Sequence, residues 1–182
     1  MSKRIVEISK FLSFVLRHQP QEIGIALDSE GWVAVDEFLA AASRYGKSIT
    51  RQQIEEVVAT NDKKRFAMSP DGQRIRANQG HSVEVDLGLR PVEPPEFLYH
   101  GTVAGFLKAI REQGLVRGKR HHVHLSADQQ TATRVGERRG RPIILIVEAR
   151  RMHSDGREFY QSSNGVWLTE TVPAVYLQFP NE

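Results

Sequence analysis

The sequence contains no cysteine among its 182 residues. This absence excludes disulfides, thiolate nucleophiles and cysteine-based zinc sites. No run of about 18 apolar residues occurs, so we expect no transmembrane helix. Residues 1–18 follow a helical pattern and lack the apolar region and small-residue cleavage site of a signal peptide. A cytoplasmic protein is the simplest expectation.

The motifs of several common enzyme classes are also missing. No Gly-x-Gly-x-x-Gly turn joins a strand to a helix, which argues against a Rossmann or P-loop nucleotide site. The Gly-x-Ser-x-Gly elbow of serine hydrolases does not occur, and no pair of carboxylates stands out. The polar groups left for chemistry are arginine and histidine, which suit phosphate as hydrogen-bond donors and proton carriers.

Positive charge is concentrated in one part of the chain. Overall, 25 lysine and arginine residues barely exceed 22 acidic ones, and the net charge is +3. Between residues 117 and 141, seven basic residues occur with only two acidic ones, Asp128 and Glu137. The seven are Arg117, Lys119, Arg120, Arg134, Arg138, Arg139 and Arg141. This bunching fits an anionic ligand or nucleic acid; a solvated surface patch is the alternative.

The N-terminal segment is expected to form an amphipathic helix. Apolar residues recur at helical spacing over residues 3–18, and Pro20 predicts that the helix ends near Arg17 and His18. The helix dipole favours cations at that end. Both residues therefore have a structural explanation before any functional one.

Two further helices and a hairpin are predicted next. Asp36 can cap a helix over residues 37–45, and Thr50 with Gln53 forms a capping box for a helix over residues 51–60. Two short extended runs around a Pro-Asp-Gly turn then predict a β-hairpin. Three helices followed by a hairpin is the order of winged-helix domains, many of which bind nucleic acid.

A proline-containing stretch with little periodicity, residues 81–96, is expected to link two lobes, residues 1–80 and 97–182. In the second lobe we expect a helix over residues 103–113 with Phe106 facing inward. The rest favours strands over helices. Its predicted features are a helix capped by Asp128, a buried strand over residues 143–147, a turn at Asn164-Gly165 and a final strand over residues 174–179. The fold class is α+β.

The stretch from Arg120 to Ser126 is unusually polar for a strand. Alternation would place Arg120, His122, His124 and Ser126 on one face. The His-x-His spacing suggests a metal site, because neutral imidazole is a common metal ligand. No third ligand stands at a useful spacing, so we expect no metal and favour an anionic ligand.

Five stretches, in order along nearly the whole chain, resemble the RNA 2′-phosphotransferase family. They are Phe11-Leu12-Ser13-Phe14-Val15-Leu16-Arg17-His18, Lys63-Lys64-Arg65-Phe66, Leu98-Tyr99-His100-Gly101-Thr102, His122-Val123-His124-Leu125-Ser126 and Asn164-Gly165-Val166-Trp167-Leu168. The resemblance implies an N-terminal winged-helix-like lobe that binds RNA. It also implies a C-terminal mixed α/β lobe with the ADP-ribosyltransferase fold, which binds NAD.

By this resemblance, the chain is a transferase that uses NAD as phosphate acceptor to remove an internal RNA 2′-phosphate. The phosphate attacks C1″ of the nicotinamide ribose and expels nicotinamide, giving an RNA 2′-phospho-ADP-ribose intermediate. The ribose O2″ then attacks phosphorus, which yields RNA 2′-OH and ADP-ribose 1″,2″-cyclic phosphate. The family's best-known substrate is a tRNA splice junction, so RNA processing in the cytoplasm by a monomer is the expectation.

The resemblance also implies roles for individual residues. Arg17, His18, Arg65 and Arg138 match the family's catalytic set, although Arg139 competes with Arg138 as its neighbour. The NAD pocket is expected to contain His100, Gly101, Thr102, Arg120, His124, Leu125, Ser126, Asn164 and Gly165. Gly101 would let the backbone approach the ligand. Asn164 and Gly165 are first of all a turn.

The chain departs from other ADP-ribosyltransferases, which often carry tyrosine where His124 falls and a glutamate near Val166. This departure argues against modification of proteins and suits an acceptor that is already an anion. Two alternatives stay open. One is an ADP-ribosyltransferase that modifies nucleic-acid phosphates without the second step, and the other is a non-catalytic nucleic-acid-binding protein.

Overall fold

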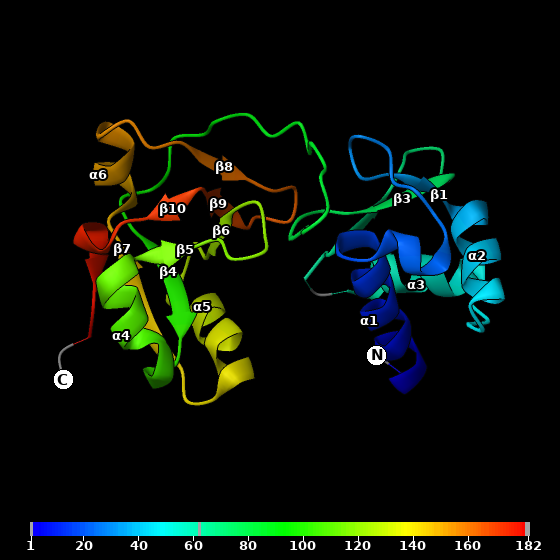
Figure 1. Cartoon of the computed structure of the whole chain (residues 1–182), viewed down its shortest axis with the longest axis horizontal. Coiled ribbons are helices and arrows are strands. Elements are labelled where there is room, and N and C mark those ends of the chain that lie inside the picture. Colours follow the sequence, from blue (N-terminus) through cyan, green and yellow to red (C-terminus); the bar gives the residue numbers. More distant parts are fainter. Residues whose placement is uncertain (1, 62, 181–182) are drawn as a thin grey trace. The chain divides into compact units, whose positions relative to one another are not determined.

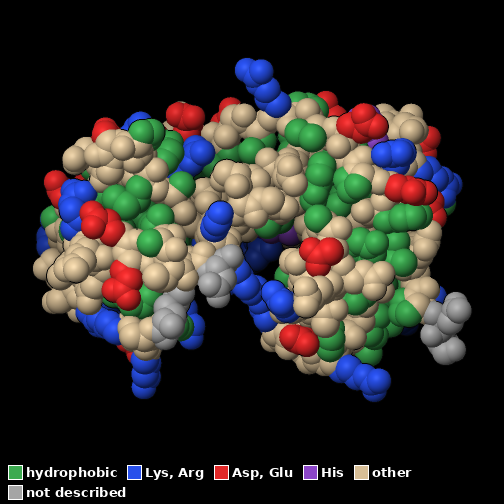
Figure 2. Space-filling model, turned by 180° about the vertical axis from the view of Figure 1, so that it is seen from behind, with side chains coloured by type: hydrophobic (Ala, Val, Ile, Leu, Met, Phe, Trp, Pro, Cys, Tyr) green, Lys and Arg blue, Asp and Glu red, His purple; other side chains and the backbone are tan. Residues whose placement is uncertain are grey.

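The computed structural model describes residues 2–61 and 63–180, and the chain divides into two compact units, Met1–Gly88 and Leu89–Glu182. Each unit combines helices with small antiparallel sheets (Figure 1). None of the described helices is long and apolar enough to cross a membrane. Acidic and basic side chains are interspersed on the surface seen in Figure 2, so local clusters are a better guide to anion sites than overall charge.

Unit 1 packs helices against one small sheet. Its elements are α1 (Lys3–Arg17), the 3-10 turn η1 (Pro20–Ile23), β1 (Val33–Ala34), α2 (Val35–Arg44), α3 (Arg51–Thr60), β2 (Phe66–Met68) and β3 (Arg74–Ala77). The strands lie in the order β1-β3-β2, and both pairs are antiparallel. The predicted helix–helix–helix–hairpin order is therefore present, and β1 adds a third strand to the hairpin.

Helix α1 supplies much of the core of unit 1. Leu12, Val15 and Leu16 are fully buried among residues of α2, α3 and the sheet. Ser2 caps its start by accepting a hydrogen bond from the Ile5 backbone. The helix ends at Arg17, as the following proline predicted.

One of the two predicted helix caps is confirmed. Thr50 and Gln53 exchange side-chain hydrogen bonds with each other's backbone N–H groups, as a capping box requires. The predicted Asp36 cap is wrong, because α2 begins at Val35 and has Ala34 at its N-cap. Asp36 lies in the first turn instead and forms a 2.7 Å ion pair with Arg51.

Unit 2 contains three small sheets and three short helices within the described residues. Its elements are β4 (Leu98–Thr102), α4 (Ala104–Gln113), β5 (Leu115–Val116), β6 (Val123–Leu125), α5 (Gln129–Gly136), the 3-10 turn η2 (Glu137–Arg139), β7 (Ile143–Val147), α6 (Ala149–Ser154), β8 (Phe159–Gln161), β9 (Trp167–Thr169), β10 (Thr171–Val172), the 3-10 turn η3 (Ala174–Tyr176) and β11 (Leu177–Gln178). The sheet orders are β11-β7-β4, β6-β9-β8 and β10-β5. The predicted strand at residues 143–147 is β7, which lies at the centre of its sheet.

Three details of unit 2 differ from the prediction. The short helix α6 was missed, and residues 174–176 form a 3-10 turn, so the final strand begins only at Leu177. Phe106 was expected to face inward, but it is 45% exposed. Its ring lies 5.5 Å from the guanidinium carbon of Arg139, within the range of a cation–π contact.

The stretch 81–96 forms backbone hydrogen bonds near both of its ends. Near its start, the backbone N–H groups of Ser82 and Val83 donate to the carbonyl oxygen of Arg17, at 2.8 and 3.4 Å. Near its end, the N–H of Val92 donates to the carbonyl oxygen of Phe159. Its first residues therefore belong to the packing of unit 1 and its last residues to that of unit 2.

Candidate active site

Arg17 and His18 lie where α1 ends. Arg17 is buried, with only 9% of its surface exposed, and its guanidinium carbon lies 6.0 Å from the ring centre of Phe66. Phe66 begins β2 and directly follows Arg65. The fold of unit 1 thus brings the end of α1, with Arg17, close to the start of β2, which Arg65 directly precedes.

The ring of His18 is oriented by a residue that the sequence analysis did not single out. Nδ1 of His18 lies 2.9 Å from Oγ of Ser82, and the backbone N–H of Ser82 donates to the carbonyl oxygen of Arg17. The C-terminal end of α1 therefore positions Ser82, and Ser82 in turn orients the ring of His18. Ser82 was missed because it lies in the stretch interpreted as a linker.

A strained turn sets the start of β2. Lys64 has a positive φ of 40°, a conformation that side chains other than glycine adopt at a cost of about 1 kcal/mol or more. Asn78 stabilises it by donating from Nδ2 to the carbonyl oxygen of Lys64, and its backbone N–H donates to that of Arg65 at 2.8 Å. Arg65 is thereby held opposite Asn78, as an extension of the β2–β3 ladder.

The polar stretch in unit 2 is a shorter strand than predicted. Only Val123–Leu125 forms β6, and Arg120 and His122 lie in the bend before it. Nη1 of Arg120 still comes within 3.4 Å of Nδ1 of His124, whereas the ring of His122 packs against Tyr160 at 5.4 Å. The two histidines therefore have different partners, and no described group of three His, Asp or Glu side chains is placed to hold a metal.

The surroundings of His100 on β4 favour the neutral form of its imidazole. Burial lowers its pKa, the charge of Arg139 lowers it further, and a hydrogen bond to the carbonyl oxygen of His124 opposes both effects. That bond joins Nδ1 to the oxygen at 3.2 Å. Because a carbonyl oxygen only accepts, Nδ1 carries the proton and Nε2 presents a lone pair. Nε2 can therefore accept a hydrogen bond from a ribose hydroxyl.

Three guanidinium groups interact electrostatically in unit 2. Partial burial lowers the pKa of Arg120, and so do the positive charges of Arg139 and Arg138. Like charges at this range repel, and an anion bound among them relieves the repulsion. This donor set fits the pyrophosphate of a dinucleotide such as NAD.

Gly101 is required by packing within unit 2. A Cβ built on Gly101 would lie 1.9 Å from the carbonyl oxygen of Ala132 and 2.9 Å from the backbone nitrogen of Gly136, both in α5. The space that we expected a ligand to use at this position is thus filled by the helix. Its neighbour Thr102 is buried, with 5% exposed.

The other expected pocket residues have clear structural roles. Leu125 is buried, and the backbone of Ser126 exchanges two hydrogen bonds with Tyr99, at 2.8 and 2.9 Å, which tie the end of β6 to β4. Asn164 and Gly165 form the turn between β8 and β9, where Gly165 has φ of 82° and Asn164 accepts from the Ser162 hydroxyl. The turn interpretation of Asn-Gly is confirmed.

Comparison with known proteins gives one consistent answer. Residues 3–171 match the model of the family described as "RNA 2'-phosphotransferase, Tpt1 / KptA family". The chain is 59% identical to a probable RNA 2′-phosphotransferase of Rhodopirellula baltica, over 98% of this chain and 97% of that protein. It is 57% identical to the protein of the same description from Streptomyces coelicolor, with 98% and 97% covered, and 54% identical to that of Pseudomonas aeruginosa, with 97% of each covered.

These matches run from the first helix to β10, through both units and through all five motif stretches. The chain therefore belongs to the RNA 2′-phosphotransferase (Tpt1/KptA) family, whose enzymes remove a 2′-phosphate from RNA with NAD as co-substrate.

Proposed function

We propose that unit 1 is a winged-helix-like lobe that binds the RNA and that unit 2 is an ADP-ribosyltransferase-like lobe that binds NAD. The order of three helices and a three-stranded sheet in unit 1 supports the first assignment. The small antiparallel sheets and the cluster of His100, Arg120 and His124 support the second. A tRNA-like splice junction is the proposed RNA, because an internal 2′-phosphate is the group to be removed.

The observation that carries this function is the arrangement at the end of α1. A buried arginine, an oriented histidine and the start of the β2 strand at Arg65 are held together by hydrogen bonds of the helix end and of Asn78. Guanidinium groups bind phosphate oxygens bidentately, and such charge-assisted bonds are strongest where solvent is largely excluded. A phosphate dianion is therefore a suitable ligand for this arrangement.

When bound, NAD supplies the electrophilic ribose carbon and the 2″-hydroxyl that takes over the phosphate. Arg120 and His124 are proposed to contact its pyrophosphate, and Nε2 of His100 a ribose hydroxyl. In unit 1, Arg17 and Arg65 are proposed to bind the RNA 2′-phosphate. For Arg138 of unit 2 the proposed role is to neutralise the charge that develops when phosphorus is attacked. No carboxylate base is needed to activate a nucleophile that is already an anion.

His18 is the proposed proton carrier of the phosphate-transfer step. That step releases a proton from a ribose hydroxyl and needs one for the departing RNA oxygen. The contact with Ser82 engages Nδ1, so exchange with the reacting groups runs through Nε2. One imidazole can serve both requirements if it accepts the first proton and returns it to the second oxygen.

The test uses a short RNA with one internal 2′-phosphate, incubated with the protein with and without NAD. We expect loss of the phosphate and release of nicotinamide only when NAD is present. An RNA with a terminal 3′-phosphate instead of the internal 2′-phosphate is the control, because a non-specific phosphatase would also remove that group. Phosphate lost without NAD, or retained with it, would contradict the proposal.

A further inference from the structure

A second arginine-bearing surface lies in unit 1, on the outer face of the β1-β3-β2 sheet. Val33 and Ile75 are paired and both point into the core. Because side chains alternate along a strand, Arg74 and Arg76 point to the opposite face of β3, and Trp32 lies on that face next to Arg76. We call Trp32, Arg74 and Arg76 the Trp32 face.

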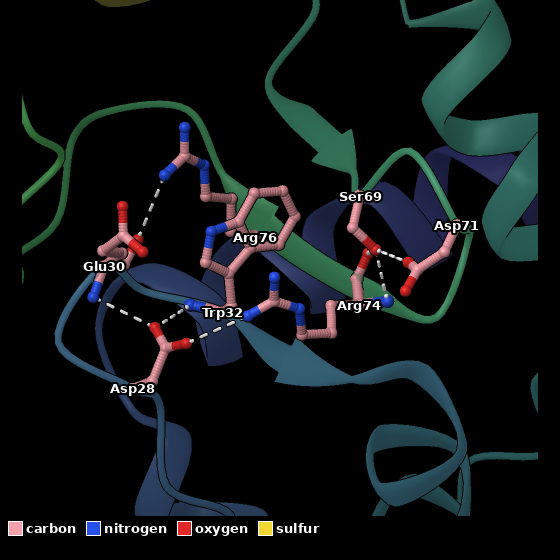
Figure 3. Close-up of polar contacts among 7 residues, drawn as sticks. All are labelled: Asp28, Glu30, Trp32, Ser69, Asp71, Arg74 and Arg76. Atoms are coloured by element: carbon pink, nitrogen blue, oxygen red, sulfur yellow. Dashed lines mark hydrogen bonds and ion pairs between the residues drawn. The ribbon is translucent and has the colours of Figure 1, made fainter.

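The three side chains of the Trp32 face are stacked. The guanidinium carbons of Arg76 and Arg74 lie 4.5 and 5.3 Å from the indole ring centre of Trp32. Figure 3 shows the three side chains grouped on the sheet. Asp28 holds the loop before Trp32 by accepting from the backbone N–H groups of Glu30 and Trp32, at 3.0 and 2.8 Å. The backbone that carries Trp32 is therefore held in place, and both guanidinium groups lie within cation–π distance of its ring.

The two arginines of the Trp32 face make only weak polar contacts with other residues of the protein. Arg74 is half exposed, and its ion pair with Asp28 is long, at 3.6 Å, so solvent screens most of it. The contact of Arg76 Nη1 with the backbone oxygen of Glu30 is also long, at 3.5 Å. Both groups keep donors for an external anion.

The same face continues toward the proposed phosphate site. Arg76 pairs across the ladder with Ala67. Arg65 directly precedes β2, and its carbonyl oxygen accepts from the backbone N–H of Asn78, so it continues the same outward alternation. Arg76 and Arg74 therefore follow at about 7 and 14 Å along β3 from that position, at about 3.4 Å per residue. A strand of nucleotides bound at Arg65 has a path along this face.

We propose that the Trp32 face binds the RNA strand that flanks the 2′-phosphate, with the indole stacking on a base and the arginines contacting backbone phosphates. Stacking on an aromatic ring and guanidinium contacts to phosphate are the means by which proteins hold single strands without reading sequence. The proposal rests on the function proposed above, and adds to it a preference for RNA that extends beyond the phosphate.

Binding can be measured without any reaction, because no turnover occurs in the absence of NAD. Trp32 and Trp167 are the two tryptophans, so the Trp167→Phe protein reports on Trp32 alone. Titration with a 12-nucleotide single-stranded RNA lacking a 2′-phosphate should quench its fluorescence. Arg76→Gln and Arg74→Gln should each weaken binding about tenfold. Each should also reduce the slope of log affinity against log salt by about 0.7.

Turnover gives a second measurement that does not depend on fluorescence. We expect wild type to favour a 12-nucleotide substrate over a minimal 2′-phosphorylated dinucleotide in kcat/KM, and Arg76→Gln to lower that ratio about tenfold. Arg44→Gln, an exposed arginine at the end of α2, is the matched control and should leave the ratio as in wild type. Thermal melting of each variant checks that unit 1 is folded.

An unchanged Trp32 signal with RNA, or a length preference that falls no further in Arg76→Gln than in Arg44→Gln, would overturn the proposal and leave the face to a protein partner. Failure of wild type to remove a 2′-phosphate would instead contradict the proposed function, and the NAD-free titration would still report on the Trp32 face. The two failures are therefore distinguishable.

Discussion

The Nδ1 atom of His18 lies 2.9 Å from the hydroxyl oxygen of Ser82. This contact joins a residue at the end of α1 to one that is 64 positions later in the chain. The backbone of Ser82 is bonded in turn to the carbonyl oxygen of Arg17. The position of the His18 imidazole is therefore determined, through Ser82, by the end of α1.

Replacing Ser82 by alanine should reduce kcat by roughly ten- to hundredfold, because a misoriented proton carrier loses its alignment with the reacting atoms. KM for RNA should change little, since the proposed role of Ser82 is to orient His18 and not to bind RNA. Steady-state kinetics separates the two effects. Ser82→Thr keeps the hydroxyl and should restore most of kcat, and Ser43→Ala, an exposed serine of α2, is the control. Equal loss in Ser82→Thr and Ser82→Ala would contradict the orienting role.

Arg138→Ala and Arg139→Ala should have different consequences. Loss of Arg138 should slow attack at phosphorus by about a hundredfold or more, so RNA that still carries the phosphate joined to ADP-ribose should accumulate. Loss of Arg139, which covers Phe106 and acts on His100, should mainly raise KM for NAD. Gel analysis of radiolabelled RNA distinguishes the two patterns. The reverse pattern would assign the catalytic role to Arg139.

Stability should fall on mild acidification. Burial lowers the pKa of both His100 and His122, so the unfolded chain binds protons more readily than the folded one. The contribution of these two histidines to the free energy of unfolding is fully present at pH values above the unfolded-state pKa of about 6.5. It decreases as the pH falls below that value, because the unfolded chain then takes up protons that the folded chain does not. Thermal melting between pH 7.5 and 5 should show this decline, and His100→Gln should reduce its slope. A slope unchanged in that variant would show that other groups are responsible.

Gly101→Ala should destabilise unit 2 by about 3 kcal/mol or more, because the new methyl group meets the backbone of α5. This corresponds to a fall in melting temperature of roughly 10 °C. Gly105→Ala is the matched control, since nothing lies within 4 Å of its Cβ position in α4. It should raise stability by up to about 1 kcal/mol. A mild effect of Gly101→Ala would mean that β4 and α5 can separate easily.

Periodicity and capping predicted most of the elements, because these signals are local. The end of α1 at Arg17, the capping box of Thr50 and the hairpin all follow from residues within a few positions. Ser82 and Asn78 were missed because their roles depend on long-range contacts, to His18 and to the strained backbone at Lys64. A lone serine or asparagine carries no such information in sequence.

The seven-residue strand from Arg120 to Ser126 shows the other kind of error. Alternation predicted that its polar residues would share one face, yet only three residues pair with β9. Arg120 nevertheless reaches His124 from the bend. Alternation predicted a shared face but no contact between these two side chains. The contact forms because a bend brings positions i and i+4 together, whereas a strand would separate them.

The glycine contact between β4 and α5 has a mechanical consequence. Gly101 lets the helix backbone rest directly on the strand, and the turn that carries Arg138 and Arg139 follows α5 without a break. Because no side chain lies between them, the backbones of β4 and α5 are in direct contact at this point. The fold itself therefore fixes the distance between His100 and the two arginines, Arg138 and Arg139, so ligand binding does not need to bring them together.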